Sequence, residues 1–285
     1  MNINTVNDCP FCGSDNLQFS DSVLMPFVAS RALGYSPFKI DKSWGLRDLP
    51  ADIEVFMPCK TVACKSCGGM FLDIRFNDSQ MQSLYQDYRT TSYNEMRSKY
   101  EPHYSSQYQD LDIPESYIRE KESFILNNCE LRDSFSLLDW GANTSQTTPF
   151  RTSPNAKVSA YDISGCAEFS KLEELPHGFS VISCSHVLEH VPYPVNELKT
   201  IRDYIEPLGY LYIELPYEKI MASSTPLIDK LNSKRHWHEH INFFSEKAIQ
   251  SMLSEAGFSV ICCEIKEPAA PGNFEKVFFV IAQKN

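Results

Sequence analysis

The sequence lacks an excess of positive charge. It contains 26 Lys and Arg residues against 37 Asp and Glu residues, which gives a formal net charge of −11. A polyanion such as RNA would have to bind against the electrostatic field of the whole protein. We therefore expect no nucleic-acid partner.

Long apolar runs are also missing. The longest strongly apolar run covers residues 277–282, which is far too short to form a membrane-spanning helix. The first ten residues, MNINTVNDCP, show no basic stretch followed by an apolar one. The sequence thus predicts a cytoplasmic protein without a transmembrane segment.

Apolar side chains are nevertheless plentiful. The chain has 285 residues, of which 42% are hydrophobic and 12% aromatic. This content is sufficient for folded cores and excludes intrinsic disorder for most of the chain, and the length indicates about two domains.

Two short cysteine motifs occur near the N-terminus. Cys9 and Cys12 form one C-x-x-C-G motif, and Cys64 and Cys67 form a second. Two such turns can direct four thiolates at one ion, which predicts a structural zinc ribbon; a redox C-x-x-C motif is the alternative. Cys59 lies outside both motifs; it is either an ordinary buried thiol or a ligand in place of one of the four motif cysteines.

The segment between these motifs, residues 13–63, is long and rich in aromatic residues and proline. Such an insertion either packs against a neighbouring domain or covers the substrate. The apolar spacing predicts one helix from residue 78 to about 100, and a second helix that begins near residue 112 and ends at about 131. We therefore divide the chain into a zinc-ribbon domain (1–77), a helical connector (78–134) and a third domain (135–285).

The third domain shows short apolar strands separated by loops. The expected strands cover residues 135–139, 158–162, 180–184, 209–215, 258–263 and 276–282. Polar residues follow the first three, as in an open parallel sheet that binds ligands at the carboxyl ends of its strands. The last two strands have no helix between them, which predicts a final antiparallel pair. Ser245 and Gly257 bound the helix expected before this pair.

Acidic residues occupy two of these strand ends. Asp139 is followed by Gly141 where a loop would pass close to a ligand, and Asp162 ends the next strand, where a ribose-binding acid belongs in a doubly wound sheet. Both acids are open to a simpler interpretation as caps of the strand ends.

Two further segments are the most specific. They read SHVLEHVPYP at residues 185–194 and HEHINFFS at residues 238–245. With these motifs the chain resembles class I S-adenosylmethionine-dependent methyltransferases over residues 135–285. The resemblance implies a Rossmann-like α/β fold with a mostly parallel sheet and an antiparallel last strand.

The resemblance also implies the cofactor contacts. Asp139, Gly141 and Ala142 would line the methionine part of S-adenosylmethionine, Asp162 would accept its ribose hydroxyls, and Ser185 with His186 would lie beside the sulfonium. The loop at residues 141–145 departs from the family because it has one glycine instead of three. The stretch from 162 to 181 is short, so we expect one crossover helix to be reduced or missing.

A similar HEH string contributes catalytic residues in sugar C-methyltransferases, which by resemblance selects Glu239 and His240. His240 is the first candidate for a general base, with a structural histidine as the alternative, and His186 is a second candidate to face the substrate. The histidines at 236, 238 and 240 are explained without a second metal ion. Those C-methyltransferases carry a further C-terminal domain, for which this chain has no residues.

These observations predict an S-adenosylmethionine-dependent methyltransferase with structural Zn²⁺ that O-methylates a sugar, nucleotide sugar or surface glycan. Association with glycan-assembly proteins follows from the resemblance to enzymes of bacterial polysaccharide pathways. A non-enzymatic scaffold of the same fold is the alternative. Carbon methylation and RNA methylation are less favoured.

Overall fold

The computed structural model describes residues 3–45, 53–88, 90–102, 114–142, 147–165, 167–267 and 276–285. Its strands in the N-terminal half are β1 (Asn4–Thr5), β2 (Leu17–Leu24), β3 (Phe38–Ile40), β4 (Ile53–Val55), β5 (Met57–Cys64), β6 (Met70–Leu72) and β7 (Ile74–Arg75). Its later strands are β8 (Phe135–Trp140), β9 (Ala156–Tyr161), β10 (Phe179–Ser185), β11 (Ile205–Pro216), β12 (His236–Trp237), β13 (Asn242–Phe243), β14 (Phe258–Lys266) and β15 (Val277–Lys284).

The helices connect and cover these strands. The α-helices are α1 (Pro26–Leu33), α2 (Asp78–Tyr85), α3 (Thr91–Tyr100), α5 (Glu115–Asn128), α6 (Pro194–Tyr204), α7 (Lys219–Ala222), α8 (Leu227–Ser233) and α9 (Glu246–Glu255). Short 3₁₀ turns cover Lys42–Trp44 and Leu172–Glu174. Among the described helices, none combines the length and the apolar character that crossing a bilayer requires.

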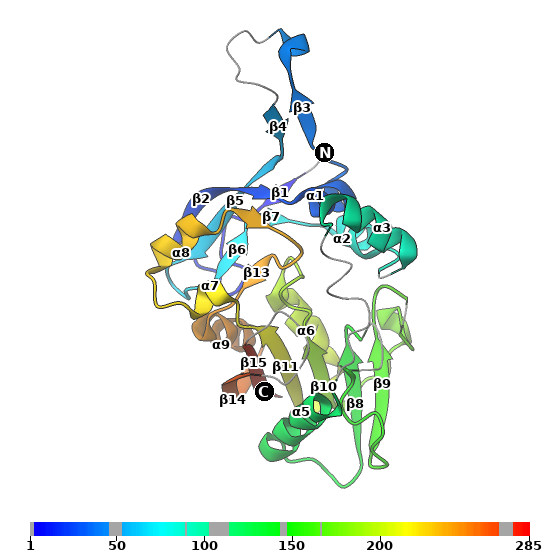
Figure 1. Cartoon of the computed structure of the whole chain (residues 1–285). Helices are drawn as coiled ribbons and strands as arrows, with labels where there is room; N and C mark the ends of the chain where they lie inside the picture. Colours follow the sequence, from blue (N-terminus) through cyan, green and yellow to red (C-terminus); the bar gives the residue numbers. More distant parts are fainter. Residues whose placement is uncertain are drawn as a thin grey trace.

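The six-stranded sheet has the order β14-β15-β11-β10-β8-β9. Strands β11, β10, β8 and β9 pair in parallel, and β15 pairs antiparallel with both β11 and β14. This arrangement confirms the predicted fold class, including the antiparallel last pair. Figure 1 shows the helices on both sides of this sheet.

Alternate residues of the central strands enter two different cores, as the period of two in a strand requires. Leu137 and Val181 pack with Phe124 of α5 on one face. Leu138 and Ile182 pack with side chains of α6 and α9 on the other. The continuous apolar strands of the sequence therefore reflect a sheet that is buried on both faces.

Helix α9 follows its sequence signals. The Ser245 hydroxyl accepts a hydrogen bond from the Ala248 amide at 3.0 Å, and Gly257 follows the helix with a positive φ of 83°. Between Asp162 and β10, the described residues contain only the 3₁₀ turn at Leu172–Glu174 and no α-helix. The expected loss of one crossover helix is thus confirmed for this part of the chain.

The five-stranded sheet has the order β12-β2-β5-β6-β13. Its centre is the long β2–β5 antiparallel pair, but its two edge strands come from residues 236–243. Trp237 of β12 is fully buried and donates a hydrogen bond from Nε1 to Thr61 Oγ1 at 2.8 Å. Residues 236–243, which belong to the predicted third domain, thus complete the five-stranded sheet of the predicted zinc-ribbon domain. The domain boundaries at residues 77 and 134 stay predictions.

The insertion at residues 13–63 has two different parts. Helix α1 packs through Phe27 and Val28 against Leu84 of α2 and Tyr93 of α3, and so against the helical connector. The β3–β4 hairpin projects away from both sheets in Figure 1. Its Trp44 is 55% exposed. The helical part of the insertion therefore packs against the connector helices, and a substrate-covering role of the insertion stays a prediction.

Candidate active site

Four parallel strands end at the same edge of the six-stranded sheet, and the predicted site residues gather there. Asp139 lies near the end of β8, Asp162 follows β9, and His186 follows β10. Glu214 lies near the end of β11 and pairs in register with the last residue of β10. This carboxyl edge is where open α/β sheets bind their ligands.

Asp139 is held inside the protein. Its side chain accepts a hydrogen bond from Thr148 Oγ1 at 2.6 Å, and the residue is only 4% exposed. Burial raises the pKa of Asp139, while the hydrogen bond from Thr148 and the charge of Lys121 partly oppose this rise. Asp139 therefore ties Thr148 to the end of β8.

The backbone after β8 passes very close to the segment after β10. Gly141 has a φ of 82°, and a Cβ atom there would lie 2.3 Å from the Val187 side chain, so a glycine is required. The Gly141 and Ala142 amides both donate to the Tyr161 carbonyl, at 2.8 and 3.1 Å. The atypical residues 143–145 lie outside the described part of the chain.

Asp162 begins the turn after β9. Its Oδ1 accepts a hydrogen bond from the Ser164 amide at 2.7 Å, and its side chain is partly exposed. The carboxylate is thus fixed at the carboxyl edge and reachable from solvent. This placement is compatible with both the ribose-binding role and the capping role.

His186 is held between two carboxylates. Nδ1 lies 3.2 Å from Glu189 Oε1, and Nε2 lies 3.1 Å from Glu214 Oε1. Burial alone would lower the pKa of His186, but the charge of Glu214 and the hydrogen bonds to both carboxylates raise it to about 10. At neutral pH both ring nitrogens therefore carry a proton, and His186 is not a general base in this state.

Glu214 belongs to a fully buried ion pair. Lys121 Nζ of α5 lies 2.7 Å from Glu214 Oε2, and Tyr117 also donates a hydrogen bond to this carboxylate. Burial alone would raise the pKa of Glu214, but Lys121 and His186 outweigh burial and lower it. Lys121 also lies 3.3 Å from Ser185 Oγ. This helix of the connector thus reaches directly into the carboxyl edge of the sheet.

The two histidine motifs contact each other through their backbones. The Glu189 carbonyl accepts hydrogen bonds from the amides of Ile241 and Asn242, at 2.8 and 3.1 Å. His190 Nδ1 donates to the Glu239 carbonyl at 3.1 Å. Two segments that are far apart in the sequence therefore form one rigid unit.

The carboxylate of Glu239 is bound by side chains of helix α3. Arg97 binds its two carboxylate oxygens with Nη1 and Nη2 at 2.5 and 2.6 Å, and Tyr93 Oη donates to it at 3.0 Å. A bidentate pair of this kind has a fixed geometry. Glu239 therefore holds the loop that carries His240 in place, and its predicted catalytic part stays a prediction.

His240 forms a pair with Glu218. Its Nδ1 donates to Glu218 Oε1 at 2.9 Å, and its side chain is 27% exposed. The ring packs edge-on against His190, with 4.7 Å between the ring centroids. Burial and the neighbouring His240 lower the pKa of His190 to about 4. Of the three predicted catalytic residues, His240 best fits a proton acceptor.

The sequence did not indicate three residues that hold the site: Lys121, which pairs with Glu214, Arg97, which pairs with Glu239, and Glu218, which pairs with His240. Lys121 and Arg97 lie in the connector helices, and Glu218 follows β11. Only Lys121 gives a local signal, because it lies four residues after Tyr117 on the helix face that also carries Phe124. The other two acquire their roles through contacts that no local pattern indicates.

A family described as a methyltransferase domain matches residues 110–263, which is more than half of the chain. This chain belongs to that methyltransferase family. A comparison with curated proteins gives no match. The family membership confirms the predicted enzyme class, a methyltransferase.

Solved structures of methyltransferases are similar to this chain at low sequence identity. A SAM-dependent methyltransferase from Methanosarcina mazei has 17% identity and a TM-score of 0.44, over 56% of this chain and 96% of that one. A 1,6-didemethyltoxoflavin-N1-methyltransferase from Burkholderia thailandensis has 18% identity and a TM-score of 0.45, over 68% and 89%. Magnesium protoporphyrin IX methyltransferase from Synechocystis has 15% identity and a TM-score of 0.45, over 72% and 99%.

The methyltransferase also carries a four-cysteine cluster. The thiols of Cys9, Cys12, Cys64 and Cys67 all lie within 4.8 Å of one another. The Cys9–Cys67 and Cys12–Cys64 sulfur distances are 3.6 and 3.7 Å. Four sulfurs at about 2.3 Å from a tetrahedral Zn²⁺ would be separated by about 3.8 Å. The donor set and its spacing therefore fit a structural zinc ion.

The two cysteine turns share one backbone geometry. The Gly13 amide donates to the Cys9 carbonyl at 2.9 Å, and the Gly68 amide donates to the Cys64 carbonyl at 2.8 Å. The hydrogen bond from the Cys9 thiol lowers the pKa of Cys67 to about 6, which favours one thiolate even before a metal ion binds. Cys59 lies outside the cluster, with its sulfur 3.2 Å from Ser22 Oγ.

We expect Cys12→Ser to reduce bound zinc from one ion per chain to a small fraction and to lower the melting temperature. A structural zinc ion contributes directly to folding free energy, and three thiolates hold it less well than four. The matched control is Cys59→Ser, which should keep the full zinc content. Elemental analysis of the purified proteins measures both, and an equal zinc loss in the two variants would contradict this assignment.

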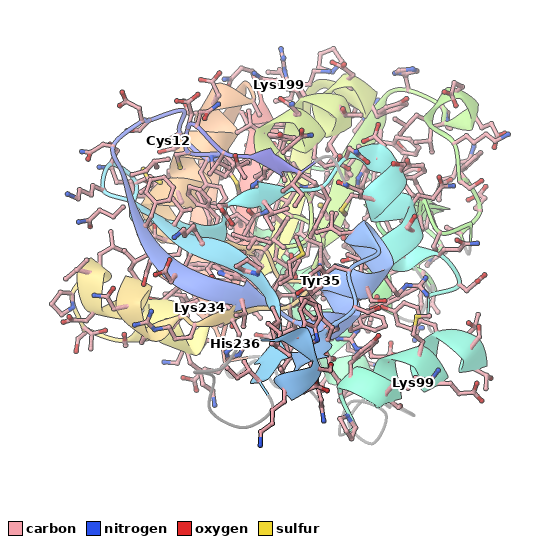
Figure 2. The ribbon with its side chains drawn as sticks, turned by 90° about the horizontal axis from the view of Figure 1, so that it is seen from above. Cys12, Tyr35, Lys99, Lys199, Lys234 and His236 are labelled. Atoms are coloured by element: carbon pink, nitrogen blue, oxygen red, sulfur yellow. The ribbon has the colours of Figure 1, made fainter. Side chains whose placement is uncertain are left out.

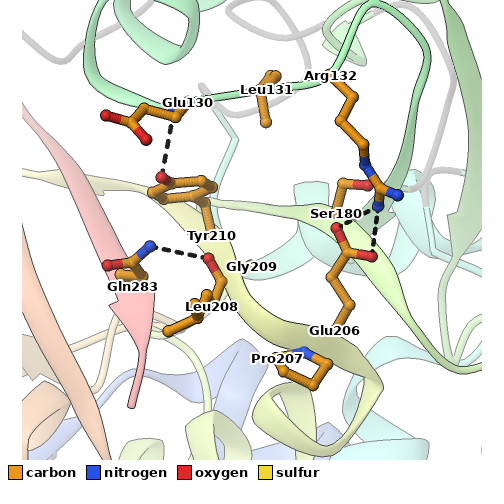
Figure 3. Close-up of a pocket in the computed structure, with 10 residues that line it drawn as sticks. All are labelled: Glu130, Leu131, Arg132, Ser180, Glu206, Pro207, Leu208, Gly209, Tyr210 and Gln283. Carbon is orange, nitrogen blue, oxygen red and sulfur yellow. Dashed lines mark hydrogen bonds and ion pairs between the residues drawn. The ribbon is translucent and has the colours of Figure 1, made fainter.

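One surface hollow lies away from this site. It is lined by residues such as Ser180, Glu206 and Tyr210, near the amino-terminal ends of β10 and β11 (Figure 3). Arg132 Nη2 donates to both carboxylate oxygens of Glu206 there, and the Tyr210 hydroxyl accepts from the Glu130 amide. The polar groups of this hollow thus bind one another, at the sheet edge opposite the candidate site.

Proposed function

We propose that this methyltransferase transfers the methyl group of S-adenosylmethionine to a hydroxyl of a sugar, nucleotide sugar or surface glycan. The observation that carries the proposal is the His240–Glu218 pair, a partly exposed imidazole held by a carboxylate at the carboxyl edge. A hydroxyl acceptor must lose its proton during methyl transfer, and a histidine oriented by a carboxylate can accept it.

In this proposal the acidic strand ends bind the cofactor. Asp162 accepts the two ribose hydroxyls, and Gly141 with Ala142 allows the methionine part to approach the backbone closely. Asp139 lies at the end of β8 just before Gly141 and is held there by Thr148. Ser185 and His186 lie beside the sulfonium, where His186 keeps Glu189 and Glu214 in a neutralised, fixed arrangement.

His240 is the proton acceptor in this proposal, and Glu239 positions it. Glu218 holds the Nδ1–H of His240, so Nε2 carries the lone pair that receives the proton of the acceptor hydroxyl. Methyl transfer from a sulfonium is an in-line displacement, so the alignment of acceptor and cofactor supplies the remaining rate enhancement. The zinc ion is structural, since four thiolates leave no open coordination position.

The proposed acceptor and setting rest on the resemblance of the zinc ribbon, the helical connector and the HEH motif to those of bacterial sugar methyltransferases. A nucleotide-sugar acceptor would place the reaction in the cytoplasm, with glycan-assembly proteins as partners. The net charge of −11 disfavours RNA as an acceptor.

The test begins with calorimetric titration of the zinc-loaded protein with S-adenosylmethionine and S-adenosylhomocysteine. We expect micromolar binding of both, followed by methyl transfer to a member of a nucleotide-sugar and glycan panel. Absence of binding would overturn the proposal and favour a scaffold of the same fold. Binding together with transfer to RNA alone would overturn the acceptor assignment.

We expect Asp162→Asn to weaken S-adenosylmethionine binding roughly 10- to 100-fold. A charged acceptor of two ribose hydrogen bonds contributes about 1.5–3 kcal/mol, and its loss reduces affinity accordingly. The control is Asp133→Asn, because Asp133 is exposed before the start of β8, at the opposite end of the strand. Unchanged affinity in Asp162→Asn would assign this acid to the turn alone.

A further inference from the structure

We infer that Glu189, His190 and His240 form a second metal site, which binds one divalent transition-metal ion at the carboxyl edge of the sheet. The ligand atoms of these three residues all lie within 4.8 Å of one another. Two imidazoles and one carboxylate are a common donor set for zinc and for other divalent transition metals. The site is distinct from the four-cysteine cluster in both ligands and location.

The hydrogen bonds of the two histidines orient them for coordination. His190 Nδ1 lies 3.1 Å from the Glu239 carbonyl, which can only accept, so this nitrogen carries the proton. His240 Nδ1 donates to Glu218 at 2.9 Å. In both rings Nε2 is therefore the nitrogen with the lone pair. Histidine ligands of metal ions are typically held in this way, by a carbonyl or a carboxylate on the other nitrogen.

The carboxylate of Glu189 supplies an independent observation. The residue is 1% exposed, and its Oε1 is bonded to His186. Its Oε2 is buried and has no hydrogen-bond partner among the described residues. A buried carboxylate oxygen without a partner is costly, and a bound cation removes that cost. The Tyr85 hydroxyl, from a ring packed against His190, is also buried without a described partner.

The backbone presents these ligands on a rigid base with one open side. The Glu189 carbonyl binds the amides of Ile241 and Asn242, which fixes the two ligand-bearing segments relative to each other. His240 is partly exposed, so further coordination positions would face solvent. Three protein ligands with an open position are typical of catalytic rather than structural metal sites.

This inference deepens the proposed function. The role of the ion in methyl transfer rests on the proposed function, whereas the existence of the site does not. Coordination and proton acceptance use the same lone pair of His240 Nε2. A bound ion would instead coordinate the acceptor oxygen and lower the pKa of its hydroxyl, whose proton would pass to solvent water, and His240 would act as a ligand of the ion. The presence of the site depends on the geometry alone.

The test is a Co²⁺ titration of protein whose four-cysteine site is filled with zinc. We expect one Co²⁺ per chain, with visible d–d absorption and no thiolate-to-cobalt charge-transfer band. Proton NMR of the cobalt protein should show two exchangeable, paramagnetically shifted imidazole N–H signals, from His190 and His240. The inference would be overturned if Co²⁺ did not bind, or if it bound without producing these two signals. This result comes from the unmodified protein and does not depend on the folding of any variant.

Variants locate the ion. Glu189→Gln and His190→Gln should abolish the cobalt signals, and Glu218→Gln should weaken Co²⁺ binding roughly 10- to 100-fold. His236→Gln is the control, because His236 is an exposed histidine of the same segment. It also lies at the end of the β2–β5 pair that is remote from Cys12 of the four-cysteine cluster (Figure 2). Folded Glu189→Gln and His190→Gln proteins with unchanged binding would overturn the site. Failure of S-adenosylmethionine binding would leave this result untouched.

Discussion

Replacing Lys121 with methionine should lower the free energy of unfolding by about 3–5 kcal/mol, because it leaves the buried carboxylates of Glu189 and Glu214 with His186 as their single cationic partner among the described residues. Lys121 and Glu214 are 1% and 0% exposed, and their Nζ and Oε2 atoms are 2.7 Å apart. Methionine preserves most of the side-chain volume, so the expected loss reflects the missing positive charge beside Glu214. Chemical denaturation followed by circular dichroism measures it.

Two controls separate this charge effect from general damage. The double variant Lys121→Met/Glu214→Gln removes both charges and should recover a large part of the loss, since a neutral amide needs no counter-ion. Lys199→Met removes an exposed lysine that lies 3.5 Å from Glu255, and should cost less than about 1 kcal/mol. Lys199 is labelled at the edge of the molecule in Figure 2. A double variant no more stable than Lys121→Met would contradict the explanation.

Replacing His240 with glutamine should reduce kcat roughly 10²- to 10⁴-fold while leaving the S-adenosylmethionine affinity nearly unchanged. The expected size is that of a lost proton acceptor in the transition state. Affinity should survive because the proposed cofactor contacts come from the ends of β8, β9 and β10, whereas His240 is held by Glu218. Calorimetry and a methyl-transfer assay give the two quantities separately.

The control for this change is again His236→Gln, which alters a histidine of the same segment with an exposed side chain. It should keep both turnover and affinity. If His240→Gln lost affinity as strongly as turnover, the residue would be a structural element of the pocket instead of a proton acceptor.

Local patterns were sufficient for most elements of the fold. The strands at the carboxyl-edge site, the cap of α9 at Ser245 and the reduced crossover before β10 all follow from neighbouring residues. The cysteine turns do as well, because spacing within each C-x-x-C-G motif dictates the turn. The helix expected over residues 78–100 is divided, since Asp87 adopts a positive φ of 56° between α2 and α3.

The functional roles of single residues were less accessible. The sequence assigned Glu239 and His186 to catalysis because they belong to specific motifs. In the structure Arg97, from 142 positions away, binds Glu239, and two carboxylates hold His186 as an imidazolium. Such pairings depend on which segments meet in space, and charged side chains carry no periodic signal for this.

By itself, the sequence determined the α/β class, the four-cysteine cluster and the two histidine motifs of this methyltransferase, because each depends on residues close together in the chain. Only the tertiary structure decided that residues 236–243 complete the N-terminal sheet and lock onto Glu189. It alone brought His190, His240 and Glu189 within reach of one ion. These contacts are long-range, and the free energy of packing, rather than local propensity, selects them.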